Sequence, residues 1–437
     1  MKKIKISIWV LLLSGFTTIY AQENSITFSN VDEIIAVALN KNKDLNTYLL
    51  QQQKSVIEYK KDRNYILPTI SGTLSYQNNF DLSTTVIPGD AFGQPGETIE
   101  TQIGEKYNYN AGINLSKTIM DKEARMKAKI SEVSTRISQA ETEVFKQLLI
   151  EQTAFYYYSV LVSKRAVVIS KEDLIISDSI NKLTINKYNE GLISLSERNQ
   201  ATINRNSVQQ SLLSNENIYY QSLTNLKLLL GVGYDYNIEL TEDITKFDTN
   251  SFSNPVISTD KNLEVSMLHK EQSELAIKKE KQAYLPKLSL NGYFGKQQWS
   301  ESSGFNSNND WSNYSFININ ASIPIFEGFS KKNKLKIAKL DNEIAIQNYQ
   351  IEQTNATTND LQLLDEYERN KISLKITHEN YKLTKDNTDF ALLRYEQGLL
   401  SLDAYFKLYD DYLSAENVYL NSLSTVFTQY STILSRQ

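Results

Sequence analysis

Two copies of one motif decide the fold of this chain: YNEGLISL at residues 188–195 and YEQGLLSL at residues 395–402. A long segment precedes each copy, and the one before the first motif, residues 121–187, contains no Pro or Gly. In that segment, apolar residues recur at steps of three and four from Ile130 to Val144, which is the spacing of a coiled-coil seam. At 1.5 Å per residue, such a helix is on the order of 100 Å long. The two motifs therefore predict two long helices, each ended by a glycine turn.

An internal repeat organises the rest of the chain. Three further matches occur in the same order in both halves: Leu-Pro at 67–68 and 285–286, SKTIMD at 116–121 against SIPIFE at 322–327, and LSNENIY at 213–219 against LSAENVY at 413–419. We therefore predict two structural repeats, residues 22–232 and 263–437, joined by a connecting segment at 233–262. Each repeat is expected to contain a helix, two strands, a long helix and a final helix.

The predicted elements of the two repeats have matching bounds. In the first repeat they are strands at about 68–80 and 105–117, a long helix at about 121–187 and a turn at 188–195. In the second repeat they are strands at about 286–299 and 313–325, a long helix at about 329–394 and a turn at 395–402. The first repeat has 12 extra residues between its strands, because 218 residues separate Pro68 from Pro286 but 206 separate Asp121 from Glu327. We assign them to a loop in the Gly/Pro-rich stretch 81–104.

The N-terminus has the pattern of an export signal, residues 1–21. Lys2, Lys3 and Lys5 form a basic start, residues 6–16 form a short apolar core, and Ala21 supplies the small residue of a cleavage site. The core is too short for a transmembrane helix, and the alternative is a retained N-terminal anchor. No later segment approaches the ~18 apolar residues that a membrane helix requires. If the exported chain enters a membrane, it must do so as strands.

The four predicted strands alternate apolar and polar residues, as the strands of an outer-membrane barrel do. The residues expected to face lipid are Leu74, Tyr76, Ile113, Leu115, Leu288, Leu290, Ile317, Ile319 and Ile323. The alternative is a soluble sandwich with one solvated face. Four strands cannot close a barrel, since about eight are needed, and an open sheet in lipid would leave two unpaired edges. Several chains should therefore contribute strands to one barrel.

The chain resembles the outer membrane efflux protein (TolC) family. The resemblance rests on the opening helix FSNVDEIIAVAL at 28–39, the two Leu-Pro strand entries, IPIFEG at 323–328, the paired turns, and LLG at 229–231. It implies a homotrimer with a 12-stranded β-barrel in the outer membrane and an α-helical barrel in the periplasm. The implied fold is mainly α with a four-stranded antiparallel β contribution from each chain. The implied partners are outer-membrane lipid, a periplasmic adaptor protein and an inner-membrane pump of the proton-driven or ABC type.

The resemblance also assigns candidate functional residues. The two glycine turns would be the periplasmic tips, where adaptor hairpins dock, through Gly191, Leu192, Ile193, Gly398, Leu399 and Leu400. The alternative is that these apolar residues only pack within their hairpins. The family's periplasmic aperture, which often carries acidic residues, maps onto Ala404 and Lys407, a departure from that pattern. In this alignment Asp403, Asp410 and Asp411 are expected to face elsewhere.

Composition excludes most other kinds of protein. The chain has no Cys and two His far apart, His269 and His378, which removes thiolate chemistry and makes a His-based metal site untenable. The formal charge of −5 is not the excess of basic residues that is typical of nucleic-acid-binding proteins. With no nucleophile elbow, HExxH or phosphate loop, we expect no enzyme and no cofactor. The expected function is a passive duct for small-molecule efflux or type I protein secretion; the alternative is a secreted coiled-coil adhesion or structural protein with a soluble β head.

Overall fold

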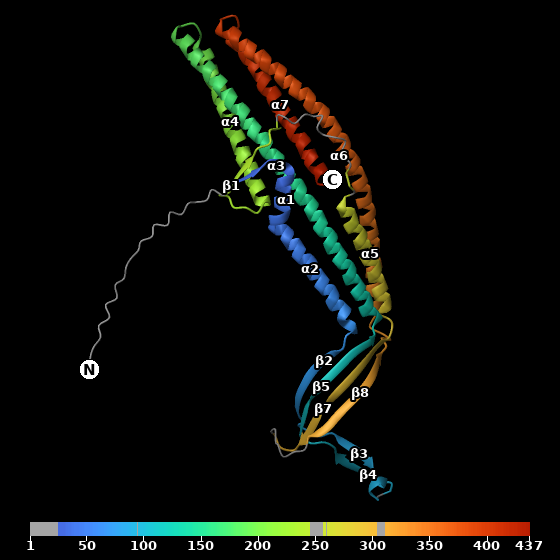
Figure 1. Cartoon of the computed structure of the whole chain (residues 1–437). Coiled ribbons are helices and arrows are strands. Elements are labelled where there is room, and N and C mark those ends of the chain that lie inside the picture. Colours follow the sequence, from blue (N-terminus) through green and yellow to red (C-terminus); the bar gives the residue numbers. More distant parts are fainter. Residues whose placement is uncertain (1–24, 94, 245–256, 259, 304–310) are drawn as a thin grey trace, which may run out of the picture.

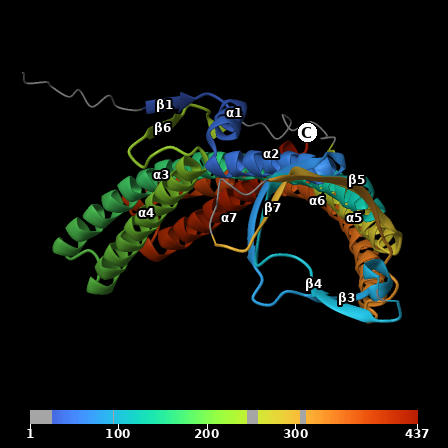
Figure 2. The ribbon, with the colours of Figure 1, turned by 90° about the horizontal axis from the view of Figure 1, so that it is seen from below.

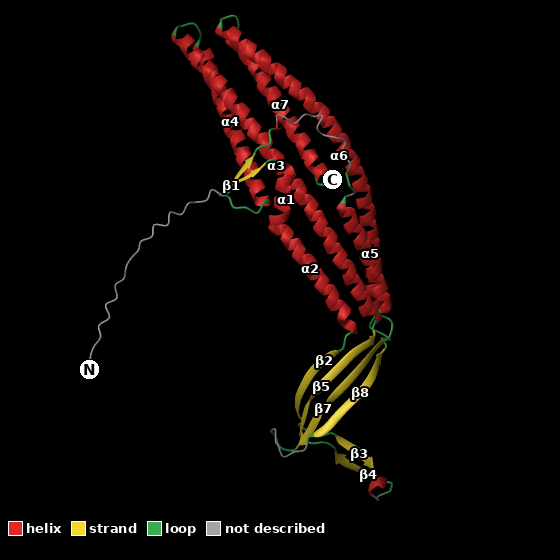
Figure 3. Cartoon of the chain, viewed as in Figure 1, coloured by secondary structure: helices red, strands yellow, loops and turns green. Residues whose placement is uncertain are grey.

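The computed structural model describes residues 25–93, 95–244, 257–258, 260–303 and 311–437. The predicted export signal lies outside these residues. Helices fill one end of the molecule and the main sheet the other, as Figure 3 shows. The fold is mainly helical with an antiparallel sheet, which confirms that part of the prediction. Among the described helices, none combines the length and the apolar character needed to cross a membrane.

Two long helical hairpins dominate the structure (Figure 1). The first is α3 (Lys122–Asn189) with α4 (Leu195–Leu229), and the second is α6 (Ser330–Glu396) with α7 (Leu402–Leu434). Asp121 caps the start of α3, because its carboxylate accepts the backbone N–H of Ala124 at 2.8 Å. The two hairpins are in contact because α3 packs against α7.

Three shorter helices complete the helical layer: α1 (Val31–Lys41), α2 (Lys43–Arg63) and α5 (Lys261–Gln282). In the half nearest the sheet, α2 packs on α3, α3 on α5, and α5 on α6. In the half nearest the hairpin turns, α4 packs on α3, α3 on α7, and α7 on α6. The long helices α3 and α6 thus run through both halves, and shorter helices fill the remaining positions end to end.

The main sheet has the order β2-β5-β7-β8, all antiparallel. Its strands are β2 (Thr69–Asn78), β5 (Tyr107–Met120), β7 (Lys287–Ser300) and β8 (Ser312–Ser322). The helices that lead into or out of these strands are α2, α3, α5 and α6, so the order of the helices repeats the order of the strands. Within the described residues, β2 and β8 each have one neighbour and are the open edges of the sheet.

The stretch 81–104, which we predicted as a loop, contains a second hairpin, and that prediction is wrong. Its strands are β3 (Thr84–Pro88) and β4 (Thr98–Gln102), joined through the short 3-10 helix η2 (Gly89–Phe92). Both strands are rich in Thr, Val and Ile, residues that favour extended backbone. In Figure 2 this hairpin lies on the opposite side of the helical layer from β1, β6 and α1.

A parallel strand pair and α1 lie over the middle of the helical layer. The pair consists of β1 (Ser25–Phe28) and β6 (Asn237–Leu240). Phe28, Ile34, Ile238 and Leu240 are buried there in one core with the middle of α3. Asn42 separates α1 from α2: its side-chain oxygen accepts the N–H of Leu45, and its amide donates to the carbonyl of Leu229 at the end of α4. The ends of three helices are thereby joined at one residue.

Aromatic rings fill much of the interior of the second hairpin. Tyr395, Tyr405, Tyr409 and Tyr412 follow one another with ring centroids about 6 Å apart, and Tyr381 continues the column at 5.8 Å from Tyr412. Such offset pairs contribute about 0.5–1.5 kcal/mol each beyond the area they bury. This column accounts for part of the unusual number of tyrosines, 27 in the chain.

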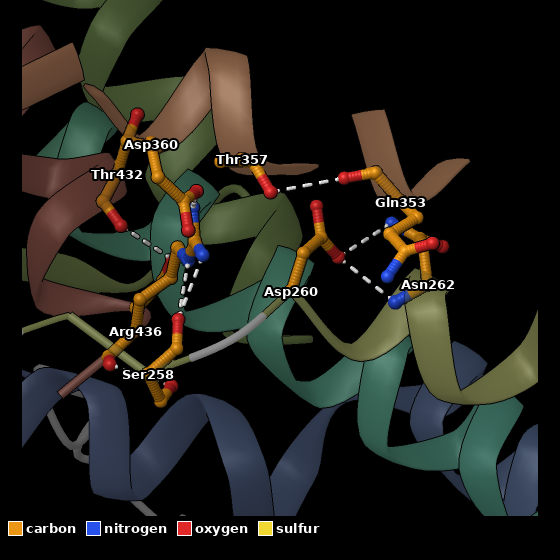
Figure 4. A network of polar contacts seen from close by, with 9 residues as sticks. Ser258, Asp260, Asn262, Gln353, Thr357, Asp360, Thr432 and Arg436 are labelled. Atoms are coloured by element: carbon orange, nitrogen blue, oxygen red, sulfur yellow. Dashed lines mark hydrogen bonds and ion pairs between the residues drawn. The ribbon is translucent and has the colours of Figure 1, made fainter. Parts of the chain in front are cut away.

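A buried arginine fastens the C-terminal end of the chain (Figure 4). Arg436 is 6 % exposed; it forms an ion pair with Asp360 of α6 and donates to the carbonyl of Ser258 at 2.7 Å. Ser258 in turn donates its backbone N–H to the carbonyl of Arg436 at 2.8 Å. A few residues on, Asp260 caps α5 by accepting the N–H of Asn262 at 2.8 Å. The end of α7, the start of α5 and the middle of α6 are therefore joined.

Candidate functional site: the hairpin tips, the two sheet faces and the open edges

The two hairpin turns have the same backbone structure. Gly191 and Gly398 have φ of 73° and 76°, in the left-handed region that favours glycine. At the first tip the N–H of Leu192 bonds to the carbonyl of Lys187, and at the second the N–H of Leu399 bonds to that of Arg394, each at 2.8–2.9 Å. This is the Schellman arrangement, in which a glycine ends a helix and satisfies its last carbonyls. Both turns are therefore built to reverse a helix within a few residues.

The six predicted tip residues fall into two environments. Leu192 is 67 % exposed and Leu399 is 65 % exposed. Ile193 and Leu400 are half-buried, and Leu400 packs against the hydrophobic core of its hairpin. Space around Gly191 and Gly398 is open, since a Cβ atom at either position would meet nothing within 4 Å. Each tip thus presents one exposed leucine beside a glycine turn.

The two tips of one chain are also bound to each other. The ammonium of Lys187, at the end of α3, donates to the carbonyl of Tyr395 at 3.2 Å. The same ammonium lies 4.0 Å from the centroid of the Tyr395 ring, within the range of a cation–π interaction. Tyr395 itself is buried at the end of α6. The first and second tips therefore form one continuous end of the molecule.

Beside the tips lies a hollow of about 620 Å³ between α4 and α7, which we call the tip hollow. Its lining consists of Ser194, Ser196, Glu197, Gln200, Asp403, Phe406, Lys407, Asp410 and Asp411. Asp403, Asp410 and Asp411, which were expected to face elsewhere than the aperture, share this hollow with Lys407. Their position relative to the aperture stays a prediction. Burial raises the pKa of Asp410, and the charge of Asp411 raises it further. Ala404 is half-buried and does not line the hollow.

One face of the main sheet is mostly polar, apart from Tyr293, Tyr314 and Phe316, and its polar side chains bond to one another across the strands. Ser116 of β5 donates to Asn291 of β7 at 2.9 Å, and Asn291 donates to Asn318 of β8 at 3.3 Å. Nearer β2, the amide of Asn114 bonds to the hydroxyl of Thr73. Amide and hydroxyl groups thus bond across each pair of neighbouring strands, and the surface they form is suited to contact with water.

The other face of the sheet is apolar. The strand register places eight of the nine residues predicted to face lipid on it: Leu74, Tyr76, Ile113, Leu115, Leu288, Leu290, Ile317 and Ile319. For example, Leu290 lies opposite Ile319, whereas Ser289 lies opposite Asn320 on the polar face. The ninth, Ile323, directly follows β8 and is exposed. Ile317 and Ile319 are also largely exposed, so this face has no cover among the residues that the structure describes.

The open edges of the helical layer carry exposed apolar residues as well. On α6, Ile337, Ile344 and Ile351 are seven residues apart, which places them on one side of a coiled-coil helix, and all three are exposed. On α2, at the opposite edge, Leu50 and Ile57 are also seven residues apart and exposed. Both edges of one chain therefore present apolar seams that nothing within the described chain covers.

Comparison with known proteins gives one family and several similar structures. A family model described as "outer membrane efflux protein" matches residues 34–232 and 256–405. The structure resembles the Campylobacter jejuni CmeC outer membrane channel, with a TM-score of 0.76 at 20% identity, covering 93% of this chain and 85% of that one. It also resembles the open state of the Neisseria gonorrhoeae MtrE outer membrane channel, with a TM-score of 0.73 at 17% identity, covering 93% and 88%. The outer membrane protein VceC from Vibrio cholerae gives a TM-score of 0.70 at 15% identity and 93% of both chains. No curated protein sequence matches the chain.

Proposed function

The chain belongs to the outer membrane efflux protein family, and from that premise we propose that it forms the trimeric outer-membrane duct of a tripartite export system. The family is one of channels rather than enzymes. The observation that carries the proposal is the pair of open edges on a four-stranded sheet with one apolar face. The duct would pass small molecules or secreted proteins, with the choice of cargo made by the inner-membrane pump.

Barrel closure supports three copies. An edge strand in lipid would leave its N–H and C=O groups without partners, which the hydrocarbon does not permit. The strand β2 leaves the helical end and β8 returns to it, so β8 of one copy can pair antiparallel with β2 of the next. Three copies of four strands make twelve, enough to close a barrel around a lumen. In this assembly the apolar face lies against lipid and the amide-rich face lines the lumen.

The helical layer can close in the same way. Its edge helices are α6 on one side and α2 with α4 on the other, and each side has exposed apolar residues. Pairing the seam of α6 with that of α2 on the next copy would bury Ile337, Ile344 and Ile351 against Leu50 and Ile57. The resulting periplasmic tunnel would end at the hairpin tips. Ala404 and Lys407 would lie near its aperture, where three copies of α7 come together.

The tips would dock a periplasmic adaptor, which links the duct to a proton-driven or ABC-type pump in the inner membrane. The exposed Leu192 and Leu399 support this role, because exposed apolar residues at a turn are typical of a partner site. A secreted adhesion protein with a soluble β head, the alternative reading of the sequence, is not favoured. Its β head would have to cover an apolar face that the described chain leaves exposed.

Export from a strain that lacks the gene tests this function. Returning the intact gene should restore export and place the chain in the outer-membrane fraction, from which only detergent releases it. The matched control is the same gene without the codons for residues 84–102, since the hairpin β3–β4 lies outside the main sheet; this variant should still reach the membrane. Two results together would contradict the proposal. The full-length chain would be recovered as a soluble protein in the restored strain, and the strain that lacks the gene would export normally.

A further inference from the structure

Two buried carboxyl groups meet at the contact between the two hairpins, where they hydrogen-bond to each other and line one hollow. Asp173 belongs to α3 and is 3 % exposed, and Glu416 belongs to α7 and is 5 % exposed. The hydroxyl of Tyr412 donates to the Asp173 carboxyl at 2.9 Å, and that of Tyr409 donates to the Asp173 backbone carbonyl at 3.4 Å. The Oε2 atom of Glu416 is buried and has no hydrogen-bond partner. An unsatisfied, buried carboxylate oxygen is costly, whereas a protonated carboxyl there is far less so.

The charged groups around this pair do not neutralise two carboxylates. The helix α6 contributes Lys385, which is already 3.6 Å from Glu172 of α3 and partly exposed. It also contributes Tyr381 beside Tyr412, while α7 adds Asp410, which lines the same hollow and whose charge acts on Tyr409. The pair lines a polar hollow of about 400 Å³, whose α4 side holds Gln200, Asn204, Ser207, Ser211, Ser214 and Asn215, all uncharged. Two like charges in such a place cannot both be stable.

We propose that Asp173 and Glu416 share one proton and act as a pH-sensitive latch that holds α7 of the second hairpin against α3 of the first. With the proton present, one carboxyl donates to the other across the contact between the hairpins. When the proton leaves to water, two buried carboxylates face each other, and α7 loosens from α3. The latch itself is a property of one chain. Its consequence for the aperture, through Ala404 and Lys407 on the same helix, rests on the proposed duct.

The proton belongs on Glu416. The Tyr412 hydroxyl donates to Asp173 at 2.9 Å and favours its ionised form; Tyr412 also lowers the pKa of Glu416, but Oε2 of Glu416 has no donor. Burial, and then the charge of Asp173, raises the pKa of Glu416 to about 8. In an unfolded chain the same group ionises near its ordinary value of 4.5. Because the pKa is raised in the folded state, the latch is complete below about 4.5 and is lost as the pH rises through about 8.

Thiol labelling can follow the latch, because the natural chain has no Cys. A Ser177→Cys reporter lies on α3 one turn from Asp173, at a position 2 % exposed. We would measure its labelling rate in the purified full chain and in the same chain with Glu416→Gln, from pH 6 to pH 9. The ratio of the two rates is the readout, because the pH dependence of the thiol itself cancels in it. The rates should be equal at pH 6 and differ by about tenfold at pH 9, one pH unit above half-titration. Glu379→Gln, an exposed acid on α6, is the control and should leave the ratio at one.

A second variant and an infrared measurement complete the test. Asp173→Asn should also remove the pH dependence, and it serves if Glu416→Gln fails to fold. Infrared spectra of the unmodified chain should show a protonated carboxyl band at pH 7 that disappears by pH 10. A labelling ratio that stays flat from pH 6 to pH 9, or spectra without that band at pH 7, would overturn the latch. Neither readout needs export, so the latch and the proposed duct can fail separately.

Discussion

Replacing Leu399 and Leu400 together by aspartate is expected to abolish export while the trimer still assembles. Leu399 is exposed at the second tip, and a charge there would be buried when an adaptor docks. The two positions differ in burial in the structure. Leu399→Asp alone should suffice, because Leu400 is half-buried in its own hairpin and its replacement also disturbs packing. Leu192→Asp at the first tip should act in the same direction, more weakly.

A change in the backbone at Gly398 is also expected to abolish export. Its φ of 76° disfavours a β-branched residue, so Gly398→Val should also abolish export. Gly398→Asn is the matched control, because asparagine tolerates this conformation and the surrounding space is open. Export and adaptor cross-linking in cells are the measurements, with the trimer level as the reference. Normal export and normal cross-linking in Leu399→Asp would show that the tips do not dock an adaptor.

Ile319→Arg is expected to remove the chain from the outer membrane, whereas Asn320→Arg should be tolerated. These neighbours point to opposite faces of β8: Ile319 lies opposite Leu290, and Asn320 opposite Ser289. An arginine against lipid near the bilayer midplane costs about 2–4 kcal/mol, and one in a water-filled lumen costs little. The amount of trimer in the outer-membrane fraction measures the difference. Equal depletion by the two variants would mean that the apolar face does not meet lipid.

Much of the fold could be predicted because its signals are local. A glycine turn, a Leu-Pro strand entry and alternating side chains each need only a few residues, and their recurrence at matching positions led to the prediction of two repeats. The family resemblance drawn from them is confirmed by the family model. The assignment of lipid-facing, docking and aperture residues stays a prediction.

The features that were missed are of two kinds, local ones that the sequence obscured and one that depends on a contact between distant segments. The β3–β4 hairpin was hidden by the Gly and Pro residues around its Thr- and Ile-rich strands. Asp403, Asp410 and Asp411 lie four, three and four residues from Lys407, so helix periodicity alone places them on one side of α7, and the approach of α4 then forms the hollow that they share. Asp173 and Glu416 are 243 positions apart, and in the sequence each looks like an ordinary surface acid. Only the packing of α7 on α3 brings them together.

Engineered disulfides test most directly whether three copies close one barrel through β8 and β2. The chain has no Cys, so every cross-link must come from the introduced residues. Ser71→Cys on β2 would be combined in turn with Asn318→Cys, Asn320→Cys and Ser322→Cys, all on the polar face of β8. The pair Ser116→Cys and Asn291→Cys, opposite each other within one chain, is the positive control. One of the β2–β8 pairs should yield a covalent trimer on a non-reducing gel, and each single variant should not. If the control pair forms its disulfide while every β2–β8 pair remains a monomer, the trimeric barrel is contradicted.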